Sequence, residues 1–201
     1  MKIDADRAAQ LVAAALVVTA VTQMIYVALG GGGNSSIAYP IWRIETLSAL
    51  VVTLFSFVIL RRHALIGGCL AVNGIFNVIQ TGMGLTMFYQ LGYGGEGPPN
   101  PVFFPVLRMS FFLYFAAKAA LGVAAVVLGI LLWQSLNGGI WRIVGLLVGV
   151  AGLAALLLNA AAMALGLGVV PYAGAVGVVA AVLTALALLR GFGALADETA
   201  S

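Results

Sequence analysis

The chain has 201 residues, of which 63% are hydrophobic and only 7% are charged. Soluble domains carry about 25% charged residues, so this composition excludes a soluble globular protein and indicates an integral membrane protein. The net charge of +3 comes from few ionisable groups, and no basic cluster alternates with aromatic residues, so we expect no nucleic-acid partner.

The first apolar segment, about 8–29, predicts a membrane-spanning helix with Asp4 or Asp6 as its N-cap. The glycines at 30–33 suit its end. A cleaved signal peptide is the alternative interpretation. Its apolar core is about 7–15 residues long, whereas this segment is long enough to cross a bilayer. We therefore expect an uncleaved first helix.

The next two helices are expected at about 40–60 and 64–88. Pro40 suits the first turn of the earlier one, where a missing N–H costs little. Glu45 follows about one turn later and is an acid inside an apolar segment. Along the later helix, polar side chains recur at steps of four or three and so share one face, namely Asn73, Asn77 and Gln80.

A stretch rich in glycine and proline at 89–105 predicts irregular structure before a fourth helix at about 108–133. Lys118 lies about 15 Å beyond Arg108 at the rise of a helix, near the midplane of a hydrocarbon core about 30 Å thick. A lysine there costs at least about 2.5–3.5 kcal/mol, so it should face protein or water and have a partner. Tyr114 lies one turn earlier on the same face.

The last two helices are expected at about 140–165 and 171–189, before a polar tail at 190–201. Small residues on one face of a membrane helix allow close helix packing. In the first of the two helices this face consists of Gly145, Gly149 and Gly152. We expect both helices to serve packing or oligomerisation, with a homo-oligomer or a membrane-protein partner docking through these glycines.

Lysines and arginines are biased toward one side of this topology. With the N-terminus inside, only Arg43 and Arg108 fall on the outer side, whereas the cytoplasmic segments hold Lys2, Arg7, Arg61, Arg62, Arg142 and Arg190. We therefore predict one all-α domain spanning 1–201, a polytopic bundle of six transmembrane helices with both termini cytoplasmic. We expect it in the bacterial inner membrane, in contact with the lipid bilayer.

Four of the predicted helices place polar residues in one layer between the midplane and the outer interface. These candidate ligand-binding residues are Gln23, Glu45, Asn73, Asn77, Gln80, Tyr114 and Lys118. We predict a pocket open to the outside, where Lys118 contacts an anionic or carbonyl group. The alternative is a satisfied buried Lys118–Glu45 pair, with the amides serving only as hydrogen bonds between helices.

The sequence favours binding over catalysis. One histidine and one cysteine, Cys69, do not provide the spacing of a metal site, and no nucleophile–histidine pair is apparent, so we expect no metal, cofactor or catalytic residue. Two functions remain. The first is binding or transport of a small lipophilic or anionic molecule. The second is the role of a non-catalytic accessory or assembly subunit in a larger membrane complex.

Overall fold

The computed structural model describes residues 3–30, 35–93, 98–134, 139–166, 168 and 170–190, and within these residues the fold is all-α. The six α-helices expected from the sequence are confirmed, and a π-helix continues the third. They are α1 (Ala5–Ala28), α2 (Ser35–Leu60), α3 (Ala64–Met83), η2 (Gly84–Phe88), α4 (Phe103–Gln134), α5 (Gly139–Leu165) and α6 (Ala173–Leu189). The expected tail, apart from Arg190, lies outside the described residues.

Two helices begin earlier than predicted. Helix α2 begins at Ser35 and contains Pro40 as its sixth residue, so this proline lies inside the helix and not in its first turn. Helix α4 begins at Phe103, with Pro105 as its third residue. The first four N–H groups of a helix have no partner inside it, so a proline at the third position removes no hydrogen bond.

Helices α1 to α5, with η2 included in the third span, are long and apolar enough to cross a membrane. Helix α6 is shorter, with 17 residues. At about 1.5 Å per residue it extends about 26 Å, near the lower limit for a span. The predicted N-cap of α1 is confirmed, because the Asp4 side chain accepts a hydrogen bond from Arg7 N at 2.8 Å.

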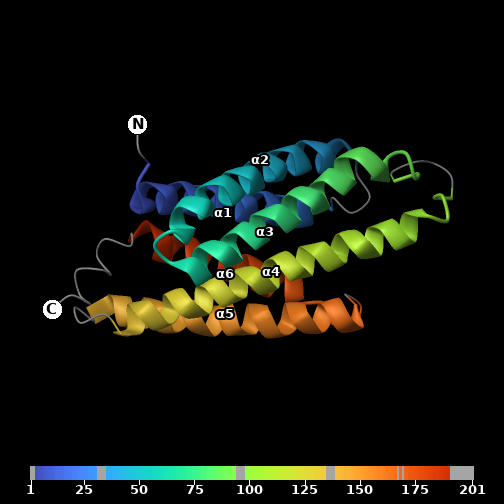
Figure 1. The fold of residues 1–201 in the computed structure, drawn as a ribbon. Helices are drawn as coiled ribbons and strands as arrows, with labels where there is room; N and C mark the ends of the chain where they lie inside the picture. The colour runs from blue at the N-terminus through green and yellow to red at the C-terminus, as the bar shows by residue number, and fades with distance from the viewer. Residues whose placement is uncertain are drawn as a thin grey trace.

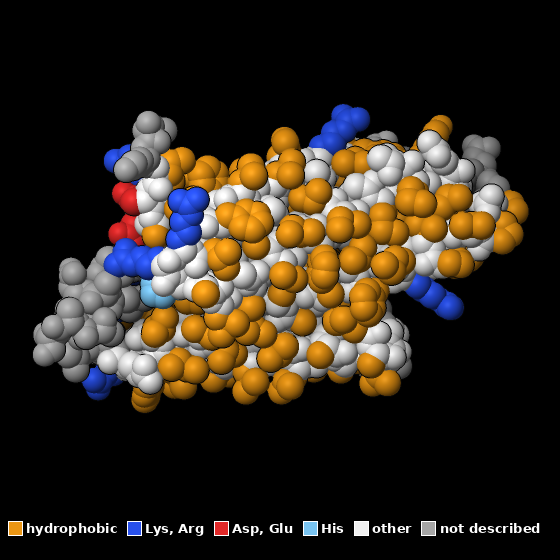
Figure 2. Space-filling model, viewed as in Figure 1, with side chains coloured by type: hydrophobic (Ala, Val, Ile, Leu, Met, Phe, Trp, Pro, Cys, Tyr) orange, Lys and Arg blue, Asp and Glu red, His pale blue; other side chains and the backbone are white. Residues whose placement is uncertain are grey.

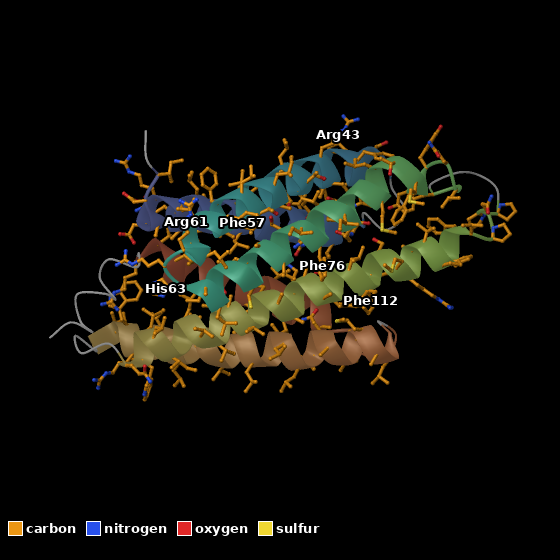
Figure 3. All side chains as sticks on the ribbon, viewed as in Figure 1. Arg43, Phe57, Arg61, His63, Phe76 and Phe112 are labelled. Atoms are coloured by element: carbon orange, nitrogen blue, oxygen red, sulfur yellow. The ribbon has the colours of Figure 1, made fainter. Side chains whose placement is uncertain are left out.

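The helices pack side by side in chain order, and α6 returns against both α1 and α4 (Figure 1). Helix α1 begins and α6 ends at the same end of the bundle (Figure 1), called here the proximal end. The distal end is the one where α1 ends and α2 begins. Figure 2 shows apolar side chains along the bundle, with several charged groups at the proximal end, where Figure 3 labels Arg61 and His63.

Helices α4 and α5 have the most extensive contact in the bundle, and glycines on both helices allow their backbones to approach. A Cβ on Gly129 would lie 2.5 Å from Gly149 N and 2.6 Å from Gly145 O, and one on Gly122 would lie 2.6 Å from Gly152 O. The glycine face of α5 is thus real, but it is filled by α4 of the same chain. The expectation that a second copy or a partner docks through it is therefore corrected.

Candidate intramembrane ligand site

Lys118 is the most enclosed charged residue of the predicted site, with 1% of its surface exposed. Its Nζ donates a hydrogen bond to Gln23 Oε1 of α1 at 3.0 Å and lies 5.4 Å from the centre of the Tyr114 ring, within cation–π range. The apolar part of the side chain packs on α6, where a Cβ on Gly177 would lie 2.9 Å from Lys118 Cγ and Cδ. Lys118 is therefore surrounded by α1, α4 and α6.

Glu45 of α2 is also buried, with 7% of its surface exposed. It accepts a hydrogen bond from Thr22 Oγ1 at 3.1 Å, and Thr22 precedes Gln23 on α1. The opposite charges of Glu45 and Lys118 attract one another through space. Within the described residues, however, no direct ion pair joins them, and each is instead hydrogen-bonded to one of two consecutive residues of α1.

The three candidate amides of α3 have structural contacts. Asn73 Nδ2 donates to Ala117 O at 2.9 Å, and Gln80 Nε2 donates to Ser110 Oγ at 3.4 Å, so both connect α3 to α4. Asn77 Nδ2 donates to Asn73 O at 2.8 Å within α3. The contacts of Asn73 and Gln80 agree with the alternative interpretation of the amides as hydrogen bonds between helices, whereas Asn77 bonds only within α3.

Sequence reasoning missed Thr22 and the glycines of α6. A Cβ on Gly174 would lie 3.3 Å from Tyr114 Oη, so Gly174 and Gly177 together accommodate Tyr114 and Lys118. Helix α6 is thus a wall of the site, whereas it was expected to serve only packing or oligomerisation. Its two glycines at a spacing of three residues were the available signal.

Aromatic rings cover the distal side of this cluster. Tyr26 follows Gln23 by three residues and Trp42 precedes Glu45 by three residues, so both rings lie about one helical turn distal to the polar groups. The Trp42 ring centre lies 5.6 Å from those of Tyr39, Phe88 and Tyr93. The aromatic layer, as we call it, consists of Tyr26, Tyr39, Trp42, Phe88, Tyr93 and Phe103.

The aromatic layer is closely packed. Phe88 and Phe103 lie 5.6 Å apart between ring centres, and the Tyr26 and Tyr93 hydroxyls lie 3.5 Å apart. A Cβ on Gly84, the first residue of η2, would lie 2.8 Å from the Trp42 ring. Together with the low exposure of Lys118, this packing means that the pocket predicted to open outward is closed in this structure.

An open depression of about 420 Å³ lies beside the aromatic layer and is lined by Tyr39, Arg43, Leu85 and Tyr89. The Arg43 side chain is exposed and points away from the bundle (Figure 3). The depression is therefore separate from the buried Lys118 and Glu45. Within the described ranges, no three His, Cys, Asp or Glu side chains come together in a way that could hold a metal ion.

The fold and the buried charges define a polytopic helical membrane protein with an enclosed cluster of opposite charges between α1, α2, α4 and α6. The chain matches no family model, no curated protein and no solved structure. Its function is therefore inferred from the geometry of this cluster.

Proposed function

We propose that this protein binds or transports a small molecule within the membrane, and that Lys118 holds an anionic or carbonyl oxygen of that molecule. The observation that supports this most strongly is the incomplete hydrogen bonding of a buried cation. An ammonium group has three donors, but among the described residues Lys118 has one acceptor, Gln23 Oε1. Burial without a direct carboxylate partner is costly, so an acceptor on a ligand would stabilise the charge.

The proposed ligand enters from the distal side. In the orientation favoured by the basic residues, this is the outer face of a bacterial inner membrane, and both termini are cytoplasmic. The aromatic layer closes that route, so part of the layer moves to admit a ligand. Rings along the route favour a ligand that is small and partly apolar.

Native mass spectrometry of the protein, gently extracted from its own membrane, tests this proposal. We expect a retained small molecule that is lost in Lys118→Ala and in the milder Lys118→Gln, and kept in Arg142→Ala. Arg142 is the control because it is an exposed basic residue near the start of α5 and is not among the residues that contact Lys118 or Glu45. Circular dichroism and gel filtration establish which variants remain folded.

The same experiment addresses the role of an accessory subunit. Co-extracted protein chains with no small molecule would overturn the proposed binding function. They would show that the buried polar groups serve to stabilise the bundle and that the activity belongs to a complex. A retained molecule that is unaffected by both Lys118 variants would place the ligand elsewhere and would also contradict the proposal.

A further inference from the structure

The contacts of Lys118 and Glu45 indicate the chemistry of the ligand, if the proposed function holds. Lys118 requires an acceptor and Glu45 requires a donor. In the closed structure both are supplied by α1, where Gln23 offers a carbonyl oxygen and Thr22 offers a hydroxyl. These two side chains occupy the positions that a ligand with an acceptor and a donor would take.

Charge balance in the cluster restricts the ligand further. Lys118 and Glu45 contribute one charge of each sign, and both are buried. Arg43, which is close to Glu45 in sequence, is exposed and points away from the bundle (Figure 3). A ligand with only a negative charge would gain at Lys118 but would be repelled by Glu45. A ligand with both charges satisfies both residues.

Displacement of the α1 side chains is compatible with the packing. Helix α1 packs extensively on α2 and α6 but reaches α4 through the long side chains of Gln23 and Lys118. Gln23 is only half-buried. Its amide can therefore give up Lys118 to a ligand without separating two closely packed backbones.

The rest of the ligand would extend toward the aromatic layer. Tyr26 and Trp42 lie about one helical turn distal to the two α1 side chains. Their ring centres are 6.3 Å apart. Aromatic rings pack favourably against other rings or apolar groups, so this layer favours a ligand with an apolar body.

We propose that the ligand is a small zwitterion with an apolar, ring-bearing side group, as in an aromatic amino acid. Its carboxylate binds Lys118 in place of Gln23 Oε1. Its ammonium group donates to Glu45 in place of Thr22 Oγ1. Its ring packs among the side chains of the aromatic layer.

Three probes that share a phenyl ring test this assignment. Phenylalanine carries both charges, 3-phenylpropionate carries only the carboxylate, and phenethylamine carries only the ammonium group. The purified full chain in detergent is titrated with each probe, and the apparent Kd is obtained from the rise in its unfolding midpoint. We expect each single-charge probe to bind about tenfold or more weakly than phenylalanine, because the other buried charge then has no opposite charge on the probe.

Variants connect each charge of the probe to one residue. In Glu45→Gln, phenylalanine should bind no more tightly than 3-phenylpropionate. In Lys118→Met, phenylalanine should bind no more tightly than phenethylamine. Arg142→Met, the control, should respond as the unchanged protein does. Glu45→Gln keeps the size of the side chain, so it provides a test even if Lys118→Met does not fold.

Two outcomes would overturn the zwitterion assignment. If 3-phenylpropionate binds as tightly as phenylalanine and Glu45→Gln changes neither affinity, the ligand is a simple anion, and the proposed function at Lys118 still stands. If none of the three probes shifts the unfolding midpoint, the assignment fails whatever the extracted protein retains. Failure of the proposed function itself is recognised separately, by mass spectrometry.

Discussion

Lys118 is stabilised by a side-chain carbonyl, an aromatic ring and a carboxylate that is not in direct contact with it. Gln23 Oε1 accepts one hydrogen bond and the Tyr114 ring lies within cation–π range. Glu45 attracts the ammonium group without touching it. This arrangement keeps the charge inside the bundle. It also leaves N–H donors of Lys118 that can bind an acceptor on a ligand.

Loss of the charge at position 118 should destabilise the protein. Lys118→Met leaves the buried Glu45 without an opposing charge and Gln23 Oε1 without its donor. Removing one partner of a buried pair costs about 3–5 kcal/mol, and we expect the lower end because these charges are not in contact. Arg142→Met at an exposed position should change the free energy of unfolding by about 0.5 kcal/mol or less. Thermal unfolding in detergent measures both.

The coupling between the two charges has its own test. Glu45→Gln in the Lys118→Met background removes the uncompensated carboxylate, so the double variant should recover part of the lost stability. The Thr22 hydroxyl can still bond the new amide. A double variant that melts no higher than Lys118→Met alone would show that the two charges are not coupled.

Gly177 should not tolerate a methyl group. In Gly177→Ala the new Cβ would lie 2.9 Å from Lys118 Cγ and Cδ, so Lys118 or α6 would have to move. Overpacking of this kind costs about 1–3 kcal/mol. Gly82→Ala is the matched control, because nothing lies within 4 Å of its Cβ position in α3. We expect that control to unfold at the same temperature as the unchanged protein or higher, and equal losses in both variants would contradict the contact.

The sequence identifies the charges of the site better than their partners. Lys118 and Glu45 are conspicuous because ionisable residues are rare in apolar helices. Thr22 and Gly177 are not conspicuous, since threonine often bonds its own helix and glycine is common in membrane helices. Their roles depend on the rotation of α1 and α6 about their axes, which composition and spacing do not determine.

At the scale of the helices, the pairing of α4 with α5 was likewise predictable only in part. Gly122 and Gly129 are seven residues apart on α4, as are Gly145 and Gly152 on α5. The small-residue face of α5 was predictable from this pattern. Its partner was not, because a glycine face fits α4 of the same chain as well as a helix of another chain.

Two glycines of that face should respond differently to alanine. A Cβ on Gly145 would lie 2.8 Å from Gly129 O and from Trp133 N, which are backbone atoms that cannot easily move. A Cβ on Gly149 would lie 3.9 Å from its nearest neighbour, Gly129 Cα. Gly145→Ala should therefore reduce the free energy of unfolding by about 1–3 kcal/mol and lower the unfolding midpoint. Gly149→Ala should change neither quantity. Similar changes in the free energy of unfolding at the two positions would mean that Gly145 does not lie against the α4 backbone at the distance given above.

Helix ends were the least predictable feature of the elements. Residue pattern located all six helices, but prolines suggested late starts for α2 and α4. Pro105 occupies a position that needs no N–H donor, so α4 extends back to Phe103. Phe103 thereby joins the aromatic layer as a helical residue instead of lying in the irregular segment expected at 89–105.

At the scale of the whole molecule, the proposed orientation can be tested with introduced cysteines in a Cys69→Ser background. Asn100 is exposed in the segment before α4, and Arg62 is exposed where α2 meets α3. A membrane-impermeant thiol reagent added to intact cells should label Asn100→Cys and not Arg62→Cys, because basic residues remain on the cytoplasmic side. Permeabilised cells should label both, and the reverse pattern in intact cells would invert the topology.

The π-helix η2 places one additional residue in the chain where the third span meets the aromatic layer. It holds Gly84 against Trp42 and brings Phe88 into the aromatic layer. A π-helix is closed by hydrogen bonds from residue i to i+5, so its turn holds one residue more than the turn of an α-helix. Deletion of one residue between Gly84 and Phe88 would therefore let this turn close as an ordinary α-helical turn. Homologues of this chain are expected to differ in length by one residue within η2 more readily than within the α-helical part of the same span.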